Sequence, residues 1–211
     1  MTKELDWTNI TGVMMKNKEK TVEKIKQAAV EEFLEKGYTK ASLRTICKAA
    51  GVTTGAMYFS FESKEALFRA ILEPLIVQYE ELLEKYMKIE LKDPEKGARL
   101  DVLMMQFILE HKKETIIIME KAQGSCYESY RRNVERMMER SFQVYYKSRL
   151  EAPPNEDLIK ILAKIRLDSC LEIIKGNYDM EYSLYLAEKI GIYANGGTEK
   201  LLQNLKEFHS N

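Results

Sequence analysis

Two short helical patterns joined by a tight glycine turn constrain the fold of this chain more than any other feature. Residues 43–50, LRTICKAA, carry apolar side chains at helical spacing, and Ser42 before them can cap the first backbone N–H groups. Gly51 follows at the position where a left-handed residue would end the helix. Thr53 then caps a second segment that runs from Thr54 to about Phe61. The pattern predicts a helix, a turn and a second helix in quick succession.

The second segment has an unusual composition for a core helix or a flexible loop, because TTGAMYFSF places small and hydroxylated residues before aromatic ones. A helix end that meets a DNA backbone needs small residues for close approach, which Gly55 and Ala56 provide. It also needs hydroxyls and free backbone N–H groups that can reach phosphate oxygens. Thr53, Thr54 and Tyr58 can supply such hydroxyls.

A longer helical pattern precedes this pair and supplies the supporting helix of a helix-turn-helix. From Lys18 onward, apolar side chains recur every three or four residues until Gly37 ends the pattern. These side chains are Val22, Ile25, Ala29, Phe33 and Leu34. We expect Val52, Met57 and Phe61 to face inward and to pin the second short helix against its neighbours.

Residues 22–72 closely resemble the DNA-binding domain of the TetR family of transcriptional repressors, through the ordered motifs AAVEEFLEKGY, SLRTICKAAGV, TTGAMYFSF and SKEALF. The resemblance implies a homodimer that places one such domain of each subunit in successive major grooves of a palindromic operator in double-stranded DNA. We further hypothesise that a small-molecule effector releases the protein from its operator. By position, the residues that would contact DNA are Ser42, Arg44, Thr53, Thr54, Ala56, Tyr58, Phe59 and Lys64.

Three positions depart from the family pattern. Cys47 stands where alanine is usual, which is typical of a small core residue, and Thr45 stands where an acidic residue is common. Phe59 stands where histidine is frequent, which favours an apolar contact, such as one with a thymine methyl group, over a phosphate contact. Arg44 has two interpretations that the sequence leaves open, a DNA contact or an ordinary exposed charge on a helix.

The rest of the chain is predicted to be all-α. Ser63 caps a long helix whose pattern contains Pro74, and the missing N–H is expected to kink that helix. The next helix starts with Asp93 as its cap and Pro94 at its first position. The segment TIIIMEKAQG could be a strand, but no partner strand is evident, so a short helix is expected. The last helices are predicted over roughly 125–149, 156–175 and 180–205.

These elements divide the chain into a flexible N-terminal arm over residues 1–17, a three-helix helix-turn-helix domain over 18–63, and a C-terminal helical domain over 64–211 for ligand binding and dimerisation. The last two helices carry wide apolar stripes, and the resemblance implies that they pair with a second copy as a four-helix bundle. Met and polar-tipped aromatic side chains suit a permissive ligand cavity, although such spacing is more often plain core packing. The candidates for this cavity are Met104, Phe107, His111, Tyr127, Tyr130 and Tyr145.

Cysteine usage indicates a reducing compartment, because Cys47, Cys126 and Cys170 are odd in number and widely spaced. Cys126 either lies in the first turn of its helix, where the dipole would lower the thiol pKa, or is a plain buried thiol. No signal peptide or membrane span is evident, so we expect a cytoplasmic protein with no membrane partner.

Charge and motif content separate the remaining function classes. The chain has 33 basic and 33 acidic side chains, but residues 16–73 carry 11 basic against 8 acidic ones, which permits nucleic-acid binding. No phosphate-binding glycine loop, catalytic grouping or metal-ligand spacing is present, so we expect neither an enzyme nor a cofactor or metal site. The alternative to a DNA-binding repressor is a purely helical adaptor that binds other proteins.

Overall fold

The computed structural model describes residues 7–90, 97–150 and 154–209, and within them the chain forms nine helices and no strand. The helices are α1 (Trp7–Lys40), α2 (Leu43–Ala50), α3 (Thr54–Ser60), α4 (Lys64–Glu90), α5 (Gly97–Glu110), α6 (Lys112–Glu120), α7 (Tyr130–Lys147), α8 (Glu156–Lys175) and α9 (Met180–His209). This architecture confirms the all-α fold class that the sequence predicts.

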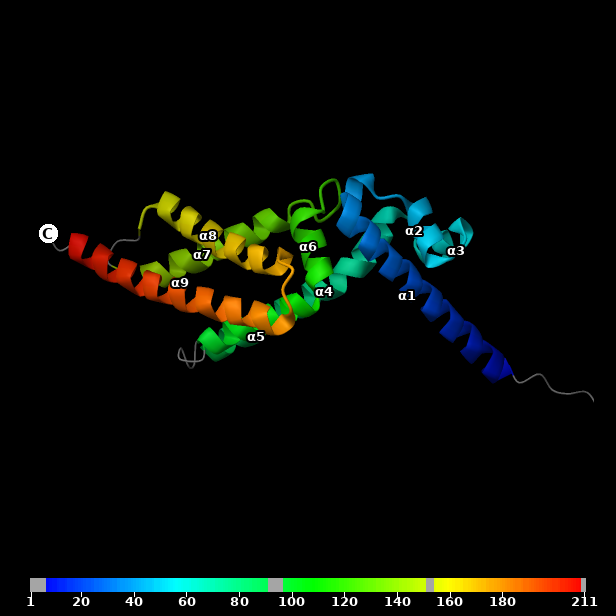
Figure 1. The fold of residues 1–211 in the computed structure, drawn as a ribbon, viewed down its shortest axis with the longest axis horizontal. Coiled ribbons are helices and arrows are strands. Elements are labelled where there is room, and N and C mark those ends of the chain that lie inside the picture. Colours follow the sequence, from blue (N-terminus) through cyan, green and yellow to red (C-terminus); the bar gives the residue numbers. More distant parts are fainter. Residues whose placement is uncertain (1–6, 91–96, 151–153, 210–211) are drawn as a thin grey trace, which may run out of the picture.

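The molecule is elongated, with α2 and α3 near one end and α5, α7, α8 and α9 toward the other (Figure 1). α4 leaves the first group and runs into the second, so it links the two groups covalently. The N-terminal part of α1, drawn in dark blue, projects away from the rest of the molecule. We call α1 to α3 the head and α5 to α9 the body.

Local signals place α2 and α3 where the sequence predicts them. Ser42 Oγ accepts a hydrogen bond from the Thr45 backbone N–H at 3.4 Å, and Thr53 Oγ1 accepts one from the Ala56 N–H at 3.1 Å. Gly51 ends α2 in the left-handed conformation, with φ 66° and ψ 34°. The predicted caps and the predicted turn are therefore confirmed.

Apolar side chains from α1 to α4 form the core beneath the head. Met57 is fully buried there and Phe61 nearly so, as predicted, whereas Val52 is half-buried at the edge of the core. The same cluster extends to Ile117 on α6 and Leu171 on α8, so head and body share one hydrophobic core. The largest fully buried side chains of α1 to α4 are Ile25, Phe33, Ile46, Met57, Leu67, Phe68 and Leu72.

Two helices begin at residues other than those predicted. α1 begins at Trp7 instead of Lys18, so the prediction of a loose arm is wrong from Trp7 onward, while residues 1–6 lie outside the described part. Apolar periodicity reveals only the part of a helix that buries one of its faces. Once that part has formed, the helix can extend by further backbone hydrogen bonds through residues that bury no face. α7 begins at Tyr130 instead of about residue 125, because residues 121–129 form turns, with Gly124 at φ 81°.

Other boundaries agree with the sequence. Gly37 interrupts α1 with φ 72° and ψ 163°, and the TIIIMEKAQG segment is helical up to Glu120. The sequence leaves open whether the last helix ends after Asn195, and α9 in fact continues through Gly196 and Gly197 without a break. Asp93 and Pro94, predicted to start a helix, lie outside the described residues.

The start of α4 follows the prediction as well. Ser63 Oγ accepts a hydrogen bond from the Ala66 N–H at 3.0 Å. The helix then runs past Pro74 to Glu90 as one element. In the body, α8 packs against α7 and α9, and α9 packs along α5.

Candidate nucleic-acid interface

α3 has a buried side and an exposed side. Met57 is fully buried, whereas Tyr58 exposes 51% of its surface and Phe59 exposes 76%. Thr53 and Thr54, at the N-terminal end of the helix, are also exposed. The fold thus brings four of the predicted contact residues together on the solvent side of α3.

The hydroxyls of Ser42 and Thr53 retain a donor while capping their helices. Each oxygen accepts a backbone N–H through a lone pair, which leaves its own hydrogen for another acceptor such as a phosphate oxygen. Ser42 is half-buried, and its backbone N–H donates to Glu32 Oε1 at 2.9 Å. Arg44 on α2 is exposed, and Ala56 on α3 is half-buried.

Lys64 differs from the other predicted contact residues because the end of α1 engages its ammonium group. Lys64 Nζ donates to the carbonyl oxygens of Tyr38, Thr39 and Ala41, at 2.7, 3.3 and 3.2 Å. It also lies 4.6 Å from the centroid of the Tyr38 ring. Three carbonyls thus match the three N–H donors of a lysine, so a phosphate contact by Lys64 would have to replace one of them.

Sequence comparison matches this head to a known family. Residues 25–71 match the family described as bacterial regulatory proteins, tetR family. This part of the chain resembles the regulators of the TetR family. The matched range runs from the buried part of α1 to the first turns of α4, so it covers α2, α3 and the turn between them.

Individual relatives are named as transcriptional regulators of the helix-turn-helix type. The chain is 52% identical over 54 residues to the transcriptional regulator YvdT of Bacillus subtilis, which spans 26% of this chain and 28% of the relative. It is 32% identical over 92 residues to the transcriptional repressor NicS of Pseudomonas putida, across 44% of this chain and 43% of the relative. The chain therefore spans less than half the length of either relative.

Solved structures support the fold beyond the head. The secondary repressor NalD of the MexAB-OprM multidrug efflux pump in Pseudomonas aeruginosa aligns with a TM-score of 0.54 at 23% identity, over 84% of this chain and 96% of NalD. This likeness shows that the fold of the head and the helical body together is shared with NalD. The family consists of transcriptional regulators and not of enzymes, in agreement with the sequence prediction.

The described part of the chain shows neither a membrane-spanning helix nor a metal-binding cluster. No helix there is long and apolar enough to cross a bilayer. The same residues hold no grouping of three or more His, Cys, Asp or Glu side chains that could bind a metal ion.

A loop between α6 and α7, residues 121–126, holds the head against the body, and we call it the latch loop. The Tyr38 backbone N–H donates to the Lys121 carbonyl at 2.8 Å, and Thr39 Oγ1 donates to the Gln123 carbonyl at 2.7 Å. The Cys126 backbone N–H donates to Glu65 Oε1 at 2.9 Å. The latch loop therefore contacts both the end of α1 and the start of α4. Sequence reasoning missed it, since its partners lie 61 and 84 residues away in the chain.

The latch loop shifts the pKa of several groups. Burial alone would raise the pKa of Glu65, but hydrogen bonds from Cys126 and Tyr38 and the charge of Arg69 outweigh it and lower that pKa. Burial, followed by the contact with Glu65, raises the pKa of the Cys126 thiol to about 11. Burial also raises the pKa of Tyr38. Both interpretations of Cys126 are therefore wrong. The residue is exposed and so is not a plain buried thiol, and no helix dipole activates it, because it precedes α7 and faces a carboxylate.

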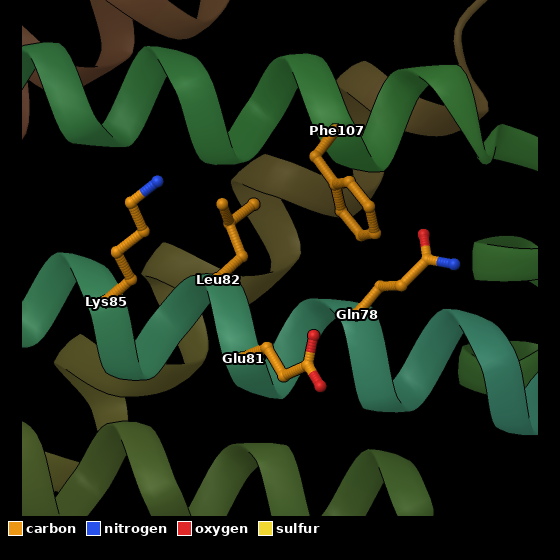
Figure 2. Close-up of a pocket in the computed structure, with 5 residues that line it drawn as sticks. All are labelled: Gln78, Glu81, Leu82, Lys85 and Phe107. Carbon is orange, nitrogen blue, oxygen red and sulfur yellow. The ribbon is translucent and has the colours of Figure 1, made fainter.

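The six candidate ligand residues do not converge on one cavity. An open groove of about 310 Å³ lies between α4 and α5, and of the six only Phe107 lines it. Figure 2 shows the Phe107 ring reaching from one helix toward the side chains of the other. His111 packs against Phe107, with ring centroids 4.9 Å apart, and Met104 is half-buried on the same helix. The other residues that line the groove are Gln78, Glu81, Leu82 and Lys85.

The three tyrosine candidates lie elsewhere. Tyr127 and Tyr130 pack against the shared hydrophobic core, and burial raises the pKa of Tyr130 to about 12. Tyr145 lies near the end of α7, with its ring 5.4 Å from the Tyr146 ring and 3.9 Å from the Arg149 guanidinium. The aromatic spacing that suggested one cavity therefore serves core packing at two of these positions.

α8 and α9 expose apolar side chains at positions that other helices do not cover. Ile161 and Ile165 are exposed on α8 one helical turn apart. On α9, Ile192 is exposed and Tyr193 exposes 78% of its surface. These four residues lie on the two helices that the sequence assigns to pairing between subunits.

Proposed function

We propose that this protein is a transcriptional repressor that binds a palindromic operator in double-stranded DNA as a homodimer and is released by a small-molecule effector. The observation that carries the proposal is the exposed side of α3, where Thr53, Thr54, Tyr58 and Phe59 face solvent while Met57 anchors the helix from below. The match of residues 25–71 to the TetR family supports it, and the name of the relative NicS favours repression.

In this proposal α3 enters the major groove, and α2 contacts the backbone beside it. Thr54, Tyr58 and Phe59 meet base edges or the adjacent sugar-phosphate backbone, with Phe59 against a thymine methyl group. Ser42, Arg44 and Thr53 would contact phosphate oxygens, since an arginine and two hydroxyls are all donors. Ala56 keeps the surface low enough for close approach. Lys64 contributes mainly by fixing the start of α4 to the end of α1.

The homodimer would form through α8 and α9, so the occupant of their exposed apolar side is a second copy of this chain. Two heads must sit about 34 Å apart to enter successive major grooves on one side of DNA. Ile161, Ile165, Ile192 and Tyr193 would then be buried between subunits, and charged residues at these positions would be costly.

Dimerisation can be tested with a matched pair of variants. We expect Ile165→Glu to shift the protein toward monomer in sedimentation velocity and to weaken operator binding. Val144→Glu changes an apolar side chain on α7 that is even more exposed than Ile165, and it should leave the dimer intact. Equal behaviour of the two variants would contradict the assignment of the interface to α8 and α9.

The effector would bind in the body. In this proposal residues 18–63 form the DNA-binding part, and residues 64–211 form the part that binds the ligand and forms the dimer. The groove beside Phe107 is the starting point for such a site, because α4 forms one of its walls and leads directly to the head. A ligand there could move α4 and thereby change the separation of the two heads. Linkage requires that ligand and DNA weaken each other's binding by the same factor.

Two routes could carry this movement, and one comparison separates them. Pro74→Ala restores an N–H that can bond the Ala70 carbonyl and removes the proposed bending point of α4. Thr39→Ala leaves α4 unchanged but removes a latch-loop hydrogen bond. A loss of effector response in only one of the variants would identify the route, and a normal response in the Pro74 variant would refute the hinge at that residue.

The DNA-binding proposal is tested by selecting sequences from a random duplex library with the full-length protein. We expect the selection to enrich a palindromic sequence. The logarithm of the binding constant for this sequence should fall linearly with the logarithm of the salt concentration, with a slope of about −0.9 for each phosphate that the protein neutralises. Tyr58→Ala should reduce binding strongly, whereas Lys200→Ala, an exposed change on α9 far from the head, should not. Failure to enrich any sequence, with no salt-dependent binding, would favour the helical adaptor instead.

A further inference from the structure

The recognition helix itself carries no charge. α3 consists of Thr54 to Ser60, TGAMYFS, without a lysine or an arginine. Binding to duplex DNA depends largely on cations that neutralise phosphates and release counterions. In the proposed DNA complex, the cations beside α3 must therefore come from neighbouring elements.

Lys64 is poorly suited to this task. It lies close to the head, but its ammonium group already donates to three carbonyl oxygens at the end of α1. The carbonyls of Tyr38 and Thr39 belong to the last residues of α1, where helical acceptors lack intrahelical donors, and Ala41 follows directly after the helix. Moving Lys64 to a phosphate would leave them to find other donors.

Lys18 is the lysine that contacts the exposed side of α3. Its Nζ lies 5.1 Å from the centroid of the Phe59 ring, which is within the range of a cation–π contact. Phe59 is the most exposed side chain on α3 among its large apolar residues, at 76%. Lys18 is itself exposed, so the pair sits at the edge of the candidate DNA surface.

The position of Lys18 is fixed by α1. The helix is continuous on both sides of Lys18, because it begins at Trp7 and not at Lys18 itself. Two turns farther along, Ile25 is fully buried in the head core and holds the helix in place. The early start of α1, which sequence periodicity did not reveal, therefore gives Lys18 a rigid support.

We propose that Lys18 is a further DNA contact of this protein, a phosphate-neutralising cation positioned by the ring of Phe59 beside the recognition helix. The ring contacts the ammonium through its face and leaves the N–H donors directed outward. Phe59 then supplies the apolar contact in the groove, and Lys18 supplies the charge at its edge. The inference rests on the proposed DNA-binding function and adds the N-terminal part of α1 to its contact surface.

The test compares full-length variants on a duplex selected with the wild-type protein. Lys18→Gln should reduce the salt slope of binding by about 0.9 for each subunit, or about 1.8 for a dimer. Lys18→Arg should keep the slope. Lys20→Gln is the matched control, because residue 20 is exposed and lies about 200° around α1 from residue 18.

A second pair of variants tests the role of the ring. Leucine at position 59 keeps an apolar side chain but has no π face, so the effect of Lys18→Gln should be smaller in a Phe59→Leu background than in the wild type. Equal effects in both backgrounds would overturn positioning by Phe59. An unchanged slope for Lys18→Gln, with steep salt dependence in the wild type, would overturn the Lys18 contact but leave the proposed function standing. A wild-type protein that binds no duplex would overturn both.

Discussion

The close approach of Gly124 to Thr39 allows the strength of the latch loop to be measured. Gly124 has φ 81°, and a Cβ atom at this position would lie 2.8 Å from Thr39 Oγ1. That oxygen donates its hydrogen to the Gln123 carbonyl at 2.7 Å. Gly124→Ala must therefore adopt a left-handed conformation and also displace Thr39 from its hydrogen bond.

The expected loss can be worked out from these two effects. A left-handed conformation costs an alanine about 1–2 kcal/mol. Losing the Thr39 hydrogen bond costs about 0.5–1.5 kcal/mol more. We therefore expect Gly124→Ala to lower the free energy of unfolding by about 1.5–3.5 kcal/mol. Gly51→Ala is the control, because Gly51 has φ 66° but no atom within 4 Å of its added Cβ, so only the first effect applies.

A double-mutant cycle isolates the collision. Thr39→Ala removes the oxygen that the new Cβ would meet, so the double variant should lose little more stability than Gly124→Ala alone. The cycle should then show a coupling energy of about 1 kcal/mol. Urea unfolding supplies the free energies, and every variant must be measured at one protomer concentration because dimerisation would shift apparent stability.

Two results would refute this reasoning about the latch loop. The first is additivity of the two substitutions within about 0.5 kcal/mol, which would mean that residues 39 and 124 do not contact each other. The second is equal destabilisation by Gly124→Ala and Gly51→Ala, which would mean that the displaced hydrogen bond contributes nothing.

Other parts of the structure give further expected outcomes. Because its pKa is raised to about 11, Cys126 should react with iodoacetamide more slowly at pH about 8 than a free cysteine, and its rate should still rise above pH about 9; saturation near neutral pH would contradict this. The folded-state pKa of Glu65 is lowered, so its carboxylate stabilises the protein above the ordinary carboxyl pKa and loses this effect as pH falls; the stability difference between wild type and Glu65→Gln should shrink between pH about 6 and about 3. Phe68→Ala should cost about 3–5 kcal/mol in urea unfolding, because Phe68 is fully buried, whereas Phe59→Ala should stay within about 0.5 kcal/mol.

The head could be predicted from sequence because its signals act over a few residues. The Ser42 and Thr53 hydroxyls each bond a backbone N–H three residues later, and Gly51 ends its helix through its own backbone conformation. Such contacts need no knowledge of distant parts of the chain. The helix boundaries around them were therefore predicted closely.

The start of α1 escaped prediction for a different reason. Apolar periodicity detects a helix by the face that it buries, and the regular pattern begins only a few residues before Val22. The helix continues N-terminally to Trp7, where no such pattern marks it. Periodicity therefore located the buried part of α1 and left the rest undetected.

Long-range contacts explain what the sequence could not reveal about Lys64 and residues 121–129. Gly37 interrupts α1, and the carbonyls that follow it lie beside the start of α4, where Lys64 reaches them. The turns before α7 are held by Thr39 and Glu65, whose distance in sequence hides the contact. The spacing of aromatic residues could not separate ligand-site residues from core residues. The same spacing places Phe107 in the wall of a groove and Tyr130 against the hydrophobic core.

The start of α4 is the point at which the contacts of the head meet those of the body. Lys64 and Glu65 are neighbours in sequence, yet Lys64 bonds carbonyls at the end of α1 while Glu65 accepts the N–H of Cys126 in the latch loop. A displacement of α4 along its axis would strain both sets of bonds together, because each is fixed at its far end to another element. The head can therefore follow α4 as a rigid unit only if the latch loop moves with it. A movement of α4 that left the latch loop behind would instead break the contact between Glu65 and Cys126. The orientation of α3 therefore depends on α4 and the latch loop jointly.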